Sequence, residues 1–144
     1  MLMITCQKLA AACLQAVDEF EKSSRSRAEC IAIMYEPDPA CPTVVVFPLP
    51  LADVLARRSE PDIVSILNPA EYADELELSL PKEIDSKLPR GDELQSIVRD
   101  VVIQLRRDMP DRLVYMTDPE CSELADSVRE APLPPALTWL SSHF

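Results

Sequence analysis

Glycine is almost absent from this 144-residue chain, in which Gly91 is the single example. Phosphate-cradling loops and dinucleotide-binding fingerprints need two or three glycines, because their backbone approaches the phosphates closely and adopts positive φ angles. The sequence therefore excludes P-loop and Rossmann-type sites, and we expect no cofactor.

Histidine is equally scarce, since His143 is the only one and lies beside the C-terminus. A histidine-based nucleophile would depend on a chain end, where order is usually low. A structural zinc site needs closely paired Cys or His ligands, and a disulfide framework belongs to secreted chains. We therefore expect no metal site, no catalytic residue and reduced thiols. The five cysteines are odd in number, widely spaced and without a C-x-x-C pair: Cys6, Cys13, Cys30, Cys41 and Cys121.

Long apolar runs are also missing, because no stretch approaches the roughly 18 apolar residues that a membrane span needs. The N-terminal sequence MLMITCQKLAAACLQAV has no basic segment before its apolar residues. Gln7, Lys8 and Gln15 interrupt it at helical intervals, which is typical of an amphipathic helix rather than an export signal. We expect a cytoplasmic protein that does not enter the membrane.

Acidic residues are abundant, giving a net charge of −11, and they are unevenly distributed. Residues 60–93 carry ten acidic and three basic side chains, a net −7 within 34 residues. Direct binding to nucleic acid is disfavoured, since phosphate contacts require concentrated Lys and Arg. A protein partner with a basic surface would suit this field.

The spacing of apolar residues predicts an α/β protein of the α+β type, with one mainly antiparallel central sheet and amphipathic helices packed on it. The domain prediction is a single domain over residues 1–144 with a proline-rich C-terminal tail at 131–144. Helical spacing predicts helices near 4–22 and 93–108, the second capped by Asp92. Short apolar and β-branched runs predict strands at 30–35, 43–47 and 113–118, the first two forming a central antiparallel pair.

The other segments give weaker patterns. Residues 51–58 and the sequence DIVSILNP fit two short helices, and the alternation in LELSL predicts a half-buried strand at 76–80. Pro119 is expected to open a helix that continues through Leu124 and Val128. In the tail, Leu137, Trp139 and Leu140 are expected to hold the chain against the body.

The candidate site is a partner-binding surface within the acidic segment. We expect Glu75 and Glu77 to share the polar face of the 76–80 strand, with Glu71 and Asp74 before it. Aromatic side chains often supply the central contacts of an interface, whereas charges at its rim speed association. The predicted partner-binding residues are therefore Glu71, Tyr72, Asp74, Glu75, Glu77 and Trp139.

Four stretches resemble a family of small acidic bacterial immunity-type proteins encoded beside toxins: KLAAACLQAVDEF, CIAIMYEPD, NPAEYADEL and TDPECSELADSVREA. The resemblance covers most of the chain as an order of elements, with Tyr72 where the family would show a tryptophan. It implies neutralisation of a toxin in the cytoplasm by occlusion, with acidic residues presented to a basic cleft.

The hypothesis is thus a non-catalytic, acidic protein-binding domain of immunity or inhibitor type. One alternative is a chaperone for a secreted effector, which an obligate dimer would favour. A second is an enzyme with an unrecognised carboxylate site, although pairs such as Asp74 and Glu77 arise easily in so acidic a chain. A deep pocket holding several acids with raised pKa values would favour the enzyme. The sequence leaves the oligomeric state open.

Overall fold

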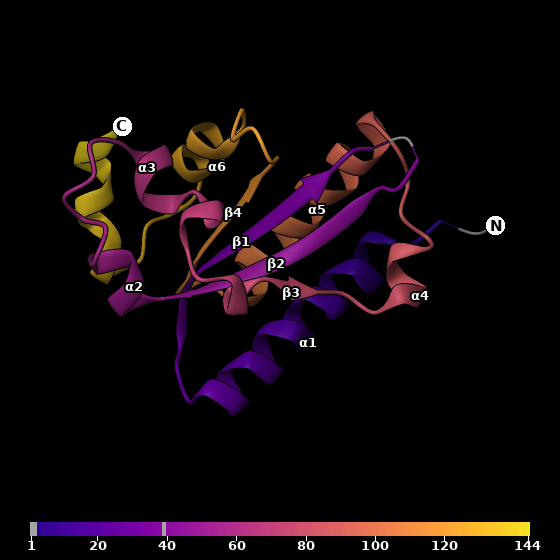
Figure 1. Ribbon diagram of the computed structural model, residues 1–144, viewed down its shortest axis with the longest axis horizontal. Coiled ribbons are helices and arrows are strands. Elements are labelled where there is room, and N and C mark those ends of the chain that lie inside the picture. The colour runs from indigo at the N-terminus through magenta and orange to yellow at the C-terminus, as the bar shows by residue number, and fades with distance from the viewer. Residues whose placement is uncertain (1–2, 39) are drawn as a thin grey trace.

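A computed structural model describes residues 3–38 and 40–144. Met1 and Leu2, which precede the expected N-terminal helix, and Pro39 of the expected proline-rich loop lie outside the described residues. These described residues form one four-stranded sheet of order β3-β2-β1-β4 (Figure 1). Strand β1 (Ala28–Glu36) pairs antiparallel with β2 (Thr43–Pro50) and parallel with β4 (Leu113–Thr117). Strand β3 (Leu78–Ser79) pairs antiparallel with β2. The predicted α+β class and mainly antiparallel sheet are confirmed.

Two long helices cover one face of the sheet. They are α1 (Cys6–Ser24), capped by Thr5, and α5 (Asp92–Asp108), which begins after Gly91 at φ 58°. Their apolar stripes pack together with Ile31 and Ile33 of β1 in one buried cluster. Asp92, expected as the N-cap, is instead the first helical residue, because Gly91 makes the turn with its positive φ.

Shorter helices cover the opposite face, and in Figure 1 they gather at one end of the sheet while α1 and α5 run alongside the strands. Leu67, Val128 and Leu137 belong to the second buried cluster, with Cys30 and Ala32 of β1. Strand β1 is therefore buried on both faces, which explains its continuous apolar sequence. The short helices are α2 (Leu51–Leu55), α3 (Ile63–Leu67), α6 (Leu124–Glu130) and the 3-10 helix η3 (Pro135–His143).

The helix expected at 51–58 is shorter, because α2 ends at Leu55. Three other expected boundaries were wrong, each for a local reason. Strand β2 continues through Pro48 to Pro50, because β3 reaches only Val45 and Val46 and leaves β2 as an edge where a missing N–H is tolerated. The strand expected at 76–80 is reduced to Leu78–Ser79. Helix α6 begins at Leu124 rather than at Pro119, because Asp118 accepts the amide of Ser122 and Cys121 adopts φ 59°.

The remaining elements lie between β2 and α5. They are the 3-10 turns η1 (Pro69–Glu71) and η2 (Asp74–Leu76), and the short helix α4 (Lys82–Asp85). Leu76 and Glu77 donate their amides to Ala73 and Asp74, so the turn η2 uses backbone donors that a longer β3 would need. Within the described ranges, no helix combines the length and apolar content required to cross a membrane.

Candidate functional site

The acidic segment is fixed to the body by its apolar residues, so its charged side chains point outward. Leu76 and Leu80 are buried, and the side chain of Asn68 caps η1 by accepting the amide of Ala70 at 3.0 Å. Between these anchors Asp74, Glu75 and Glu77 are exposed. Within the described residues none of these three carboxylates forms an ion pair. We call Asp74, Glu75 and Glu77 the acidic surface.

Glu71 differs from these three because it forms an ion pair with a neighbouring arginine. Its Oε2 lies 3.9 Å from Nη2 of Arg57, which also lies 3.6 Å from Oε1 of Glu60. Arg57 is held in place by donating from Nε and Nη2 to the carbonyl of Ser65, at 3.1 and 2.8 Å. Glu71 therefore belongs to an internal network around Arg57, and its negative charge is partly neutralised.

Tyr72 is tied into the structure rather than standing free among the acids. Its hydroxyl donates to the carbonyl of Ile66 at 2.6 Å, and the Arg57 guanidinium lies 5.8 Å from its ring centroid. Burial raises the pKa of Tyr72 above its ordinary value. The ring packs against the second core cluster and is only partly buried, so Tyr72 contributes both to the core and to the surface.

A hollow of about 290 Å³ lies beside this ring. Its apolar lining includes Met34, Phe47 and Pro119, and Asp74 and Glu77 are its acidic members. Lysine and arginine side chains combine an apolar stem with a charged end. A hollow of this size and lining can accept such a side chain from a partner, with the cation next to Asp74 or Glu77.

Glu75 and Glu77 also line a second hollow, on the α1 side of β3, together with Glu19. Glu75 and Glu77 were expected to share the polar face of a strand at 76–80; Glu75 instead belongs to η2 and Glu77 precedes β3, but the two glutamates line the same hollow. Sequence reasoning missed Glu19 as a site residue. Its position off the apolar stripe of α1 was the available signal, but only the fold brings it to β3.

Trp139 lies in η3 and has a different set of neighbours. Its Nε1 donates to the carbonyl of Ala136 at 3.1 Å, its ring centroid lies 5.2 Å from Arg58, and the His143 ring meets it edge-on at 5.5 Å. The expected anchoring of the tail rests on Leu137 and Leu140, both fully buried, whereas Trp139 is only half-buried. The acidic surface lies at β3, so the structure does not group Trp139 with it.

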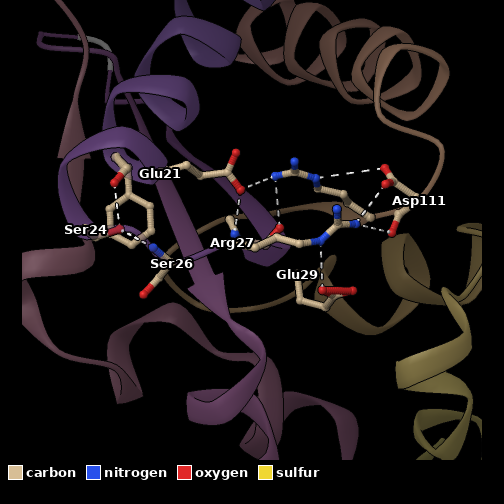
Figure 2. Close-up of polar contacts among 9 residues, drawn as sticks. Glu21, Ser24, Ser26, Arg27, Glu29 and Asp111 are labelled. Carbon is tan, nitrogen blue, oxygen red and sulfur yellow. Dashed lines mark hydrogen bonds and ion pairs between the residues drawn. The ribbon is translucent and has the colours of Figure 1, made fainter.

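Other acidic residues form ion pairs within the protein, as Figure 2 shows for the junction of α1, β1 and β4. Arg27 lies 3.1 Å from Glu29 and 2.9 Å from Asp111, and its hydrogen bond keeps the pKa of Asp111 below the ordinary value. Arg112 donates to the carboxylate of Glu21, which also accepts the amide of Ala28. These acids already have cationic partners, in contrast to the acidic surface.

The cluster of polar side chains around Glu123, just before α6, is the one that most resembles a catalytic site. Glu123 accepts hydrogen bonds from the Tyr35 hydroxyl at 2.8 Å and from the Gln95 amide. Burial and the neighbouring Glu123 raise the pKa of Tyr35, which opposes proton release at neutral pH. This cluster therefore fits a structural hydrogen-bond network better than acid–base chemistry.

A metal site of three or more ligands is not formed by the His, Cys, Asp and Glu side chains of residues 3–38 and 40–144. Comparison of the chain with protein-family models, with curated proteins and with solved structures finds no match.

Proposed function

We propose that this protein is an immunity- or inhibitor-type binding protein that neutralises a toxin or effector by covering a basic surface on it. The single observation that carries the proposal is the acidic surface. Asp74, Glu75 and Glu77 are exposed and, in the described part of the chain, without an ion-pair partner, yet they stand on a segment fixed by buried leucines. Because the buried leucines fix the backbone of this segment, binding to basic side chains has to order only the carboxylate side chains.

The apolar hollow between Asp74 and Glu77 supports the same proposal. Interfaces combine a desolvated centre with a charged rim, and here Phe47, Met34 and part of Tyr72 provide the apolar floor. The cysteines suit a cytoplasmic location, because Cys13 and Cys30 are buried free thiols whose burial raises the pKa. We propose the cytoplasm as the site of neutralisation.

The first experiment tests neutralisation with the protein encoded by the neighbouring reading frame. Expressed alone in a heterologous bacterium, that protein should arrest growth, and co-expression of this chain should restore it. The two proteins should also co-purify as a complex at low salt. Growth arrest that this chain does not relieve would show that the proposed function is wrong.

The second experiment asks whether the acidic surface makes the contact. Asp74→Lys combined with Glu77→Lys should slow association about tenfold or more at low salt, because opposite charges mainly accelerate encounter. The salt dependence of the association rate should weaken as well. Glu120→Lys combined with Glu130→Lys makes the same change of charge at two other exposed residues and should have a much smaller effect. Equal effects of the two pairs, measured by stopped-flow fluorescence, would remove the acidic surface from the interface.

A further inference from the structure

Strand β3 ends the sheet, and one of its sides is not paired with another strand in the described part of the chain. Backbone N–H and C=O groups on such an edge can pair with an extended segment of another protein. Ser79 is exposed and Leu78 half-buried, so solvent reaches this edge. The edge is accessible for the addition of a strand.

A groove runs along this edge between β3 and α1. Two hollows, of about 550 and 560 Å³, share Ala16, Glu19 and Ser79 in their linings and therefore lie next to each other along this edge. On the α1 side, its wall includes the small side chains of Ala11, Ala12 and Ala16. A further strand lies about 4.8 Å from its neighbour. Small residues on the facing helix leave room for the side chains of such a strand.

The charges of the groove select the kind of segment that fits. Glu75 and Glu77 line one end, Glu83 lines the other, Glu19 lines both hollows, and Lys8 is the basic residue among the lining side chains. A second copy of this chain is a poor occupant, because pairing two β3 edges would bring the glutamates of both copies together. An extended segment rich in Lys or Arg complements both the backbone edge and the charge.

We propose that this groove binds an extended basic segment of the partner protein, which adds to the sheet beside β3. The proposal rests on the proposed function for the partner's role, and it adds the partner's local conformation and charge. Side chains on the face of the added strand that points to α1 would lie against Ala12 and Ala16, where a basic side chain would also reach Glu19. Basic side chains nearer Glu75 and Glu77 would meet those carboxylates at the other end of the groove. Proline would be disfavoured in the segment, because it cannot donate to the β3 backbone.

The test uses a random-peptide phage library selected on the purified protein. Selected peptides should be enriched in Lys and Arg and poor in Pro, and they should shift the backbone amide NMR signals of Leu78 and Ser79. Ala16→Tyr fills the groove and should weaken peptide binding about tenfold or more, whereas Ala52→Tyr, at an exposed alanine of α2, should change it less than about twofold. Selected peptides that are acidic, or that bind Ala16→Tyr as tightly as the parent protein, would overturn the proposal.

A second variant guards against misfolding of Ala16→Tyr. Glu19→Lys with Glu83→Lys changes two exposed side chains of the groove and leaves Asp74 and Glu77 untouched. It should also weaken peptide binding about tenfold or more. Binding of the peptides by this variant at parental strength would contradict the groove assignment. If the parent protein binds the peptides but does not neutralise the toxin, only the proposed function is overturned. If both groove variants neutralise the toxin as well as the parent protein does, only the groove assignment is overturned.

Discussion

Asp85 carries a charge that the folded state accommodates poorly. It closes the short helix α4, and its Oδ1 is buried without a hydrogen-bond partner in the described residues. Burial raises the pKa of Asp85 above its ordinary value of 3.8. Because the folded state then holds the proton more tightly than the unfolded state, ionisation of Asp85 at neutral pH lowers the free energy of unfolding.

We therefore expect Asp85→Asn to raise the Tm at pH 7 to 8. The gain should shrink as the pH falls and vanish near pH 3, where the carboxyl group is protonated in both the folded and the unfolded state. Thermal unfolding followed by circular dichroism across this range measures the difference. Asp100→Asn, at an exposed residue of α5, is the matched control. A gain for Asp85→Asn that stays constant down to pH 3 would refute the buried-charge explanation.

At the level of single residues, the pattern around Tyr72 did not predict that its side chain packs against the core. The segment 68–76 consists of turns, so neither strand alternation nor helical spacing indicates which side chains face inward. The acceptor for the Tyr72 hydroxyl is a carbonyl of α3, which local sequence does not identify. Tyr72→Ala would therefore remove a core contact together with any partner contact, and the charge reversals at Asp74 and Glu77 are cleaner probes of binding.

At the level of elements, α5 was predicted within one residue, because its apolar stripe is unbroken and its N-terminal glycine marks the start. The same helix provides a sharp test of the core. Val101 is fully buried, and Ile103, two residues later, is 42% exposed. Val101→Asp should lower the free energy of unfolding by about 3–5 kcal/mol, since it buries an unpaired charge.

Ile103→Asp makes the same chemical change on the exposed side of α5. It should cost less than about 1 kcal/mol, as surface substitutions usually do. Urea unfolding followed by circular dichroism measures both variants. Similar midpoints for the two would mean that the buried face of α5 is assigned incorrectly.

The elements that were predicted less well are short and held by contacts outside their own residues. The alternation of LELSL predicted five strand residues. The amides of Leu76 and Glu77 instead bond to carbonyls within the turn η2, so the strand begins only at Leu78. After Pro119, the Asp118 side chain stabilises a turn instead of a helix by binding the backbone and hydroxyl of Ser122. Periodicity detects long amphipathic elements, but it does not report such single hydrogen bonds.

At the scale of the whole molecule, the net charge of −11 acts on stability as well as on binding. Unpaired acids repel one another, and salt screens this repulsion. Raising NaCl from about 0.01 M to about 0.1 M shortens the screening length from roughly 30 to roughly 10 Å. We expect the Tm to rise by a few degrees over this range.

The double variant Asp74→Lys with Glu77→Lys should show a smaller rise, because each reversal adds two units of charge and changes the net charge from −11 to −7. Differential scanning calorimetry at several salt concentrations measures both proteins. A Tm that falls with salt would instead indicate that ion pairs such as Arg27–Asp111 dominate the electrostatics.

The distribution of charge along the sequence is enough to locate the acidic surface, but the groove could not be predicted. It joins Glu19 and Ala16 of α1 to Ser79 of β3, which are far apart in the sequence. Their meeting depends on the packing of α1 beside the edge of the sheet. Sequence patterns identified both elements, and only the three-dimensional arrangement made them neighbours.

Because β1 pairs with β4, the sheet is completed only late in protein synthesis. β1 ends at Glu36, whereas its partner begins at Leu113, so the hairpin of β1 and β2 leaves the ribosome long before β4 exists. Until then one edge of β1 is unpaired, although α1, which precedes β1 in the chain, can already pack on one of its faces. Non-local pairing of this kind slows folding and exposes the nascent chain to aggregation. The free edge of β1 is therefore exposed while residues 51–112 are translated, and we expect chaperones that hold emerging chains to bind the protein at this stage.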